Sequence, residues 1–181
     1  MNIEKSLKST KFKILEIKNL KLNKIIKINI KNKKNLGSDR IANAIGAKKF
    51  KHCLVLDFGT ATTFDIIKNG IYEGGVIAPG INLSIKNLSQ ATALLPLINL
   101  KSHQKNYGKN TIEALNAGFV WGYEGLINNI IDKIISRSKI KYKILLTGGY
   151  ANFFNKMIKK KVVIDQDITI KGIANAYKEL I

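Results

Sequence analysis

Acidic, glycine and hydroxyl residues stand together at the end of an apolar segment in "LVLDFGTATT" (54–63), where Asp57, Gly59 and Thr60 follow the apolar run. A glycine lets the backbone approach an anion, a threonine offers a hydroxyl and an N–H, and a carboxylate binds a cation that offsets phosphate charge. We therefore predict that this turn holds the phosphates of a nucleotide together with a cation. The alternative is a structural turn in which Asp57 accepts backbone N–H groups.

A second candidate is the tetrapeptide "GSDR", which precedes a segment with helical apolar spacing. Asp39 could take a proton from an alcohol, and Arg40 could hold a substrate carboxylate through two parallel hydrogen bonds. The alternative is that Ser38 or Asp39 caps the helix that follows, which is the commoner role of such residues.

Other polar positions carry weaker signals. The glycines of "LTGG" (146–149) end another apolar run, where ligands of open α/β sheets bind. Gly108-Lys109 does not belong to a P-loop, because His103 stands where that loop has its first glycine. For His52 and His103 we expect packing or surface roles.

The elements that must position these residues follow from hydrophobic periodicity. Asn69-Gly70 is a strong hairpin signal, so 53–77 is predicted to form three consecutive strands, the first of them central, with a turn at 59–61. The longest helical pattern is 111–136, with a core-facing isoleucine stripe from Ile127 to Ile135. Further strands are expected at 24–30, 143–150 and 162–164, and further helices at 37–50, 81–95, 151–160 and 172–181. This pattern indicates an α/β fold.

Composition narrows the class of protein. The formal net charge of +19 invites a nucleic-acid-binding hypothesis, but Arg40 and Arg137 are the only arginines and the lysines are scattered over the whole chain. We therefore interpret the charge as a solvated lysine surface and expect no nucleic-acid partner. The single cysteine, Cys53, lies in an apolar run, which predicts a buried, inert thiol and a reducing compartment. No segment resembles a signal peptide or a membrane span, so we expect a cytoplasmic location without membrane contact.

Six motifs together resemble the type III pantothenate kinases, in the order and spacing of that family. They are "LGSDRIANAIGA", "LVLDFGTATTFDII", "YEGGVIAPGINLS", "TALLP", "GKNTIEALNAGFVWGYEGLI" and "LTGGYA". The resemblance runs from about residue 25 to the C-terminus. It implies the ribonuclease H-like, actin-like ATPase fold of the sugar kinase, actin and Hsp70 superfamily.

The resemblance also implies an activity. The family phosphorylates pantothenate with ATP and Mg²⁺, the first step of coenzyme A biosynthesis, as a homodimer that needs K⁺ or NH₄⁺. By resemblance, Asp39 is the proton acceptor, and Gly37, Ser38, Arg40 and Thr111 join it in binding pantothenate. By resemblance also, Asp57 binds the monovalent cation, Gly59 and Thr60 contact ATP, and Gly148 and Gly149 lie near the adenosine.

The chain departs from the family pattern at its front. Only 36 residues precede Gly37, and no Asp-x-Gly-Asn-Thr turn, which wraps the ATP phosphates in the family, occurs among them. We therefore expect 1–36 to be a remnant of the N-terminal half and 37–181 to be the C-terminal half, carrying the pantothenate and cation sites. An exposed apolar sheet face is expected where the first half would pack. The alternatives to a pantothenate kinase are an inactive truncated homologue or dimerisation subunit and a basic nucleic-acid-binding domain.

Overall fold

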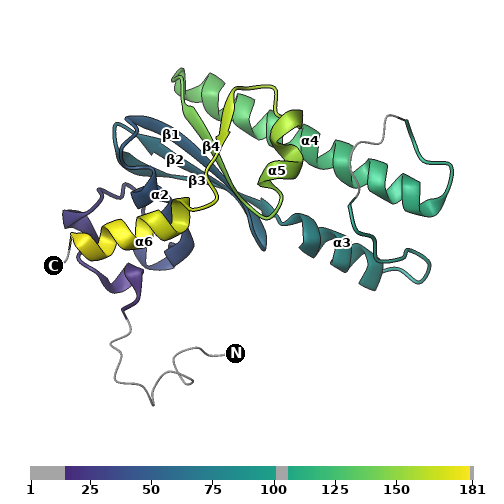
Figure 1. Ribbon diagram of the computed structural model, residues 1–181, viewed down its shortest axis with the longest axis horizontal. Helices are drawn as coiled ribbons and strands as arrows, with labels where there is room; N and C mark the ends of the chain where they lie inside the picture. The colour runs from purple at the N-terminus through teal and green to yellow at the C-terminus, as the bar shows by residue number, and fades with distance from the viewer. Residues whose placement is uncertain (1–14, 101–105, 180–181) are drawn as a thin grey trace, which may run out of the picture.

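The computed structural model describes residues 15–100 and 106–179, which form an α/β fold around one five-stranded sheet (Figure 1). The strands are β1 (His52–Phe58), β2 (Ala61–Lys68), β3 (Ile71–Pro79), β4 (Lys143–Gly148) and β5 (Val162–Ile164). The α-helices are α2 (Ser38–Gly46), α3 (Ile81–Gln90), α4 (Thr111–Ser138), α5 (Ala151–Phe154) and α6 (Ile168–Lys178). Short 3₁₀ helices lie at Ile17–Asn19, Leu22–Lys24, Lys33–Asn35 and Asn155–Met157.

Strand β1 is the centre of the sheet, whose order is β3-β2-β1-β4-β5. It pairs antiparallel with β2 and parallel with β4. The carboxyl ends of β1 and β4 therefore lie side by side at the same end of the sheet. The predicted hairpin is confirmed between β2 and β3. Asn69 and Gly70 there have φ of 53° and 71°, the left-handed conformation that a two-residue hairpin turn requires.

Alternate residues of β1 serve two different cores, because successive side chains of a strand point to opposite faces. Leu54, Leu56 and Phe58 belong to a cluster that α3, α4 and α5 cover. Cys53 and Val55 belong to a second cluster that α2, α6 and the segment from 17 to 36 cover. Burial on both faces explains why the strand is a continuous apolar run. By the same alternation, Asp57 points to the face that α2 covers.

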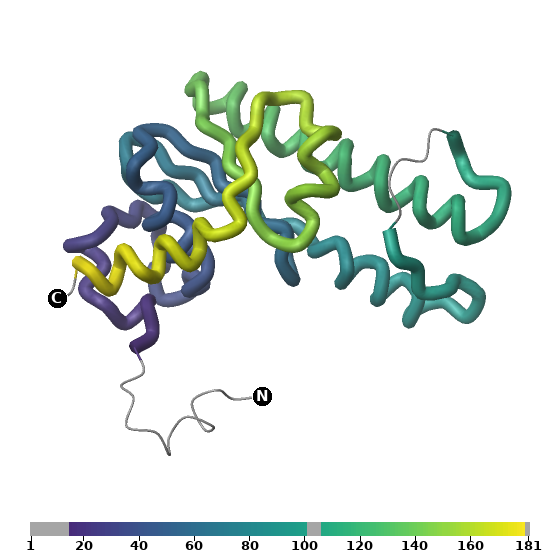
Figure 2. The backbone as a smooth tube through the Cα atoms, viewed as in Figure 1, coloured from purple at the N-terminus to yellow at the C-terminus, as the bar shows by residue number. Residues whose placement is uncertain are grey.

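Helices cover both faces of the central strands, and among the described residues the exposed apolar side chains of the sheet lie on its outer strands, at Ile77 of β3 and Val163 of β5. Figure 2 shows the cover on one side: the first described residues, α2 and the C-terminal helix α6 lie together at one end of the molecule. Helices α2 and α6 cross closely, since a Cβ on Gly172 would lie 1.8 Å from the carbonyl oxygen of Ala42.

Helix α3 ends five residues before its expected end at 95, and α6 begins four residues before its expected start at 172. Two further elements differ more strongly from the structure. Residues 24–30 were expected to form a strand, but Ile28 makes a single bridge to Tyr72 of β3. Both Ile25 and Ile26 are buried, and the alternation of a strand cannot bury two consecutive side chains on one face. The helix expected at 151–160 ends early, because the side chain of Asn128 bonds the backbone oxygen of Met157 and the N–H of Lys159.

The long helix α4 agrees with its prediction. Ile127 and Ile131 are fully buried, and Ile130, Ile134 and Ile135 pack beside them, as the stripe requires. None of the described helices combines the length and the apolarity that crossing a bilayer demands.

Candidate functional site

The N-terminus of α2 presents a carboxylate to solvent. Gly37 is the N-cap residue, so neither Ser38 nor Asp39 occupies the N-cap position that the structural alternative gave them. Asp39 is exposed in the first turn, where the helix dipole favours a negative charge, and its Oδ1 accepts the N–H of Arg40 at 2.9 Å. Ser38 donates its hydroxyl to Glu16 at 3.4 Å. The carboxylate of Asp39 is therefore accessible to a ligand.

A hydrogen-bonded chain fixes the carboxylate of Asp57. The fully buried Asn43 of α2 donates its amide to Oδ2 of Asp57 at 2.9 Å and accepts the hydroxyl of Thr169 from α6 at 2.6 Å. Burial raises the pKa of Asp57, the bond from Asn43 opposes this, and the negative charge of Asp39 raises the pKa further. One oxygen, Oδ1, is left to face the turns beside it.

Those turns bring the sequence-predicted glycines around Asp57. A Cβ on Gly148 would lie 2.7 Å from Oδ1, and one on Gly59 would lie 3.7 Å from it. Gly148 has a φ of 85°, which favours glycine, and the N–H of Gly149 bonds the carbonyl of Phe58. Thr60 is exposed in the turn between β1 and β2. The glycines let these turns approach Oδ1 of Asp57 closely without a side chain covering it.

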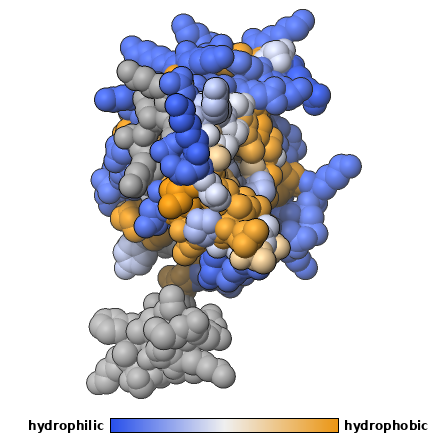
Figure 3. Space-filling model, turned by 90° about the vertical axis from the view of Figure 1, so that its right-hand side faces the viewer, coloured by the Kyte–Doolittle hydropathy of each residue, from blue (hydrophilic) through white to orange (hydrophobic). Residues whose placement is uncertain are grey.

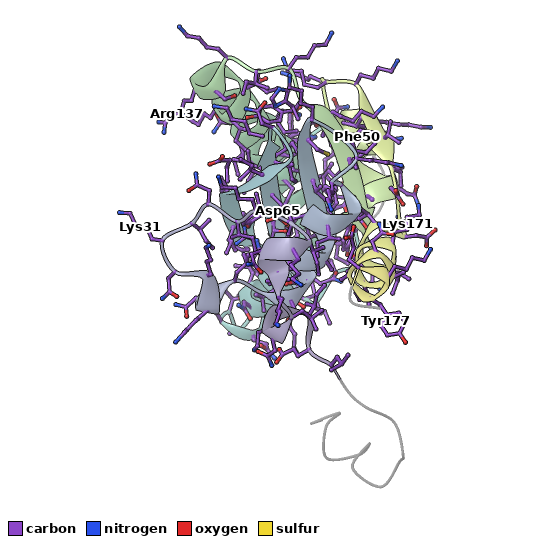
Figure 4. All side chains as sticks on the ribbon, turned by 90° about the vertical axis from the view of Figure 1, so that its left-hand side faces the viewer. Lys31, Phe50, Asp65, Arg137, Lys171 and Tyr177 are labelled. Carbon is purple, nitrogen blue, oxygen red and sulfur yellow. The ribbon has the colours of Figure 1, made fainter. Side chains whose placement is uncertain are left out.

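Arg40 is held inside the protein. Its Nε donates to Oδ1 of Asp65 at 2.7 Å, its guanidinium lies 5.8 Å from the ring centre of Tyr72, and 14% of its side chain is exposed. Asp65 is completely buried and also accepts the hydroxyl of Tyr72 at 2.9 Å. Burial raises the pKa of Asp65 to about 6, although the charge of Arg40 lowers it. Figure 4 shows Asp65 near the centre of the molecule and Lys31 and Arg137 at its periphery.

The predicted residues thus fall into two groups. The charge of Asp39 acts on both Asp57 and Asp65, so these three carboxylates lie near one another beside α2, together with the glycine turns. Thr111 is not among them. It begins α4, whose N-terminal end lies at the opposite end of the long axis from α2 in Figure 1.

Sequence reasoning missed Asn43, Thr169, Asp65 and Tyr72. Asn43 could have been found, because it follows Asp39 by one helical turn and so shares its face. Asp65 could have been found from the hairpin register, which pairs it with Val55 and thus places it on the face of Asp57. No local signal marks Thr169, which comes from the far end of the chain.

Cys53 lies outside this site and is buried, as predicted. It is fully buried, and burial raises the pKa of its thiol to about 12. His52 has a packing role: it accepts the N–H of Asn69 and contacts the edge of Tyr142. His103 lies outside the described residues.

The state of Cys53 can be tested with a thiol reagent. We expect the native protein to resist iodoacetamide at pH 8, because a thiol with a pKa near 12 is about one part in ten thousand thiolate and is covered by protein. Mass spectrometry should detect alkylation once urea unfolds the chain. Rapid alkylation of the folded protein would contradict the burial.

Candidate residues at the carboxyl ends of β1 and β4, between a central sheet and flanking helices, lie where the actin-like ATPase fold would place a ligand site. A solved Alp12 filament structure has this fold, with a TM-score of 0.50 at 15% identity over 77% of this chain and 51% of that one. A Campylobacter jejuni protein assigned to the Baf family of transcriptional activators matches with a TM-score of 0.64 at 26% identity, over 87% and 70%. The chain therefore has the actin-like ATPase fold.

The family model of type III pantothenate kinases matches residues 2–133. A type III pantothenate kinase of Pelagibacter ubique (strain HTCC1062) is 50% identical over 167 residues, which are 92% of this chain and 67% of the relative. A type III pantothenate kinase of Persephonella marina (strain DSM 14350 / EX-H1) is 39% identical, over 84% of this chain and 61% of the relative. The chain belongs to the type III pantothenate kinase family.

The chain is shorter than these relatives. It also matches the type III pantothenate kinase of Ruegeria sp. (strain TM1040) at 38% identity, over 79% of its own length and 56% of that protein. The chain thus spans between about half and two thirds of the curated relatives that it matches.

Proposed function

We propose that this chain is the larger part of an ATP-dependent pantothenate kinase, which transfers the γ-phosphoryl group of ATP to the alcohol of pantothenate and forms 4′-phosphopantothenate. The observation that carries the proposal is the meeting of Asp39 and Asp57 beside the glycine turns of β1 and β4. A base for an alcohol and a cation ligand beside glycine turns are what phosphoryl transfer requires, since its catalysis is positioning and charge neutralisation. We expect this reaction to take place in the cytoplasm.

In this proposal Asp39 orients and deprotonates the alcohol, and its exposure leaves it free to do so. Gly37, Ser38 and Arg40 surround the acceptor, with Arg40 directed at its carboxylate. Asp39 and Arg40 both lie in the first turn of α2, so the helix sets the separation of the two side chains.

The residues around Asp57 fit a monovalent cation. Asn43 occupies Oδ2, which leaves Oδ1 beside the space at Gly148 and Gly59, and K⁺ or NH₄⁺ is held by oxygen atoms. Among residues 15–100 and 106–179, no cluster of three or more histidine, cysteine, aspartate or glutamate side chains forms a metal centre. ATP would bring its own Mg²⁺, with Gly59 and Thr60 near its phosphates and Gly148 and Gly149 near its adenosine.

Replacing Asp57 by alanine tests the cation site. We expect the wild-type chain to gain thermal stability when KCl replaces choline chloride at equal ionic strength, and Asp57→Ala to lose that gain, because the anionic ligand is gone. Differential scanning fluorimetry measures both. Asp132→Ala removes an exposed carboxylate that pairs with Lys160, and it serves as the control. An unchanged response of Asp57→Ala to K⁺ would remove Asp57 as the ligand.

A coupled ATP assay with pantothenate tests the activity itself. The 181-residue chain should be compared with a form extended upstream to the length of its relatives. Turnover by the extended form alone would assign catalysis to the complete protein. Turnover by neither form would leave the alternative of a catalytically inactive homologue, and salt-sensitive retention on DNA would then favour the nucleic-acid hypothesis.

A homodimer accounts for two features that a single chain leaves unexplained. Thr111 is expected to contact pantothenate, yet its end of α4 lies far from α2 along the molecule (Figure 1). The same end carries hydrophobic residues on its surface, as Figure 3 shows. Exposed apolar side chains of the segments at this end include Leu88, Leu94, Leu97, Tyr107 and Ile112. Docking of a second copy on this patch would cover it and supply Thr111 to the partner's site.

Sedimentation tests this dimer with a matched pair of variants. Ile112 on α4 is 57% exposed and Ile170 on α6 is 66% exposed, at opposite ends of the molecule. We expect Ile112→Glu to weaken the dimer about tenfold or more, because a charge would be desolvated in the interface, and Ile170→Glu to leave it unchanged. A wild-type chain that sediments as a monomer, or equal effects of both variants, would contradict the interface.

A further inference from the structure

The guanidinium of Arg40 is held by Asp65 and lies beside Tyr72, and one of its nitrogens is left without an acceptor. Asp65 accepts from its Nε, whereas Nη2 is buried and has no hydrogen-bond acceptor among the residues that the structure describes. A buried donor without an acceptor costs on the order of 1–3 kcal/mol. An unpaired buried group of this kind requires a physical explanation, and strain or a functional role of Arg40 would supply one.

The surroundings allow this guanidinium little freedom. A Cβ on Gly75 would lie 2.6 Å from Nη2, so a side chain at that position of β3 would displace it. The ring of Tyr72 lies beside the guanidinium, and the hydroxyl of Tyr72 bonds the same oxygen of Asp65 that Arg40 does. Arg40 therefore enters any complex with its orientation already set by two neighbours on β2 and β3.

Stability alone gives a weak reason for this arrangement. A buried ion pair often stabilises a protein no more than an apolar pair of similar volume would, because both charges lose their hydration. Burial raises the pKa of Asp65 despite the charge of Arg40, which indicates how costly the carboxylate is at this place. The pair is better explained by the single orientation that it imposes on Arg40, 14% of whose side chain remains exposed at the start of α2.

We propose that Asp65 is a positioning residue for substrate recognition: it orients Arg40 so that the Nη groups bind the carboxylate of the acceptor substrate. The inference rests on the proposed function and deepens it. A planar fork of two N–H donors matches a carboxylate in two parallel bonds, which an alcohol or an amide cannot reproduce. Asp65 thus acts on binding of the acid group, while Asp39 acts on the alcohol.

The experiment compares two ligands by titration calorimetry. One is pantothenate, and the other is its analogue in which a hydroxymethyl group replaces the carboxylate. We expect Asp65→Asn to weaken pantothenate binding about tenfold or more, since a charge-assisted bond is lost and the fork is no longer held. The affinity for the analogue should change by less than about twofold, because it makes no bidentate contact with Arg40.

A double-mutant cycle shows whether Asp65 acts through Arg40. Arg40→Lys keeps the charge but removes the fork, so Asp65→Asn should add little further loss for pantothenate in its presence. Tyr72→Phe removes one donor to Asp65 without removing a charge, and it should lower pantothenate affinity in the same direction by a smaller factor. This variant tests the inference even if Asp65→Asn does not fold.

The outcomes separate this inference from the proposed function. Equal losses on both ligands, or additive effects of Asp65→Asn and Arg40→Lys, would assign Asp65 a purely structural role and overturn the inference alone. A wild-type protein that binds both ligands equally would also overturn it, because Arg40 would then not recognise the carboxylate. A wild-type protein that binds neither ligand would overturn the proposed function and this inference with it.

Discussion

Replacing Asp39 by asparagine is expected to lower the kcat of pantothenate phosphorylation by a factor of about 10²–10⁴, the range in which a positioned general base contributes. The asparagine side chain cannot accept a proton from the alcohol. The fold should persist, because Asp39 is exposed and an amide oxygen can accept the same N–H from Arg40. The measurement is a coupled assay on the upstream-extended protein, with the thermal unfolding midpoint of each variant.

Two comparisons make this result specific. Asp132→Asn changes another exposed carboxylate, which lies on α4 and pairs with Lys160, and its kcat should equal that of the wild type. Pantothenate affinity of Asp39→Asn should fall much less than its kcat if the loss is in the chemical step. A kcat within about threefold of the wild type would exclude Asp39 as the base.

Replacing Gly172 by alanine is expected to cost about 1–3 kcal/mol of unfolding free energy, as overpacking of a tight contact does. The added Cβ would lie 1.8 Å from the carbonyl oxygen of Ala42, which is backbone and cannot rotate away. Helix α6 would have to move from α2, and Thr169 would move away from Asn43 with it. The variant should therefore reduce the gain in thermal stability on adding K⁺, in addition to destabilising the fold.

Gly122→Ala provides the matched control, since it is the same change inside a helix. A Cβ there meets no atom within 4 Å, so the substitution should be neutral or should stabilise α4 by up to about 1 kcal/mol. Urea unfolding of both variants measures the difference. If Gly172→Ala were as stable as Gly122→Ala, the close crossing of α2 and α6 would be wrong.

The local elements were predictable where one residue pattern decides the structure. The Asn69-Gly70 turn, the central strand through Cys53 and the isoleucine stripe of α4 all agree with the structure, because hydrophobic periodicity and turn chemistry act over neighbouring residues. The strand predicted at 24–30 was wrong. The local alternation suggested a strand, but the segment packs its isoleucines into the cluster that includes α2. The division into 1–36 and 37–181 stays a prediction.

Candidate site residues were predictable one motif at a time, and their resemblance to the family gave each one an expected role. Asp39 and Asp57 stand at a helix start and at a strand end, which are positions that local sequence can mark. The sequence by itself determined that this is an α/β protein of the type III pantothenate kinase family with carboxylates at those two places.

Only the tertiary structure decided how these groups are held. Asn43 between Asp57 and Thr169, and Asp65 beneath Arg40, join residues that are 14 to 126 positions apart in the chain. Such contacts depend on strand register and on how α2 and α6 pack against the sheet. Hydrophobic periodicity does not encode these quantities, because a side chain's local pattern specifies the face it occupies but not the partner it meets there.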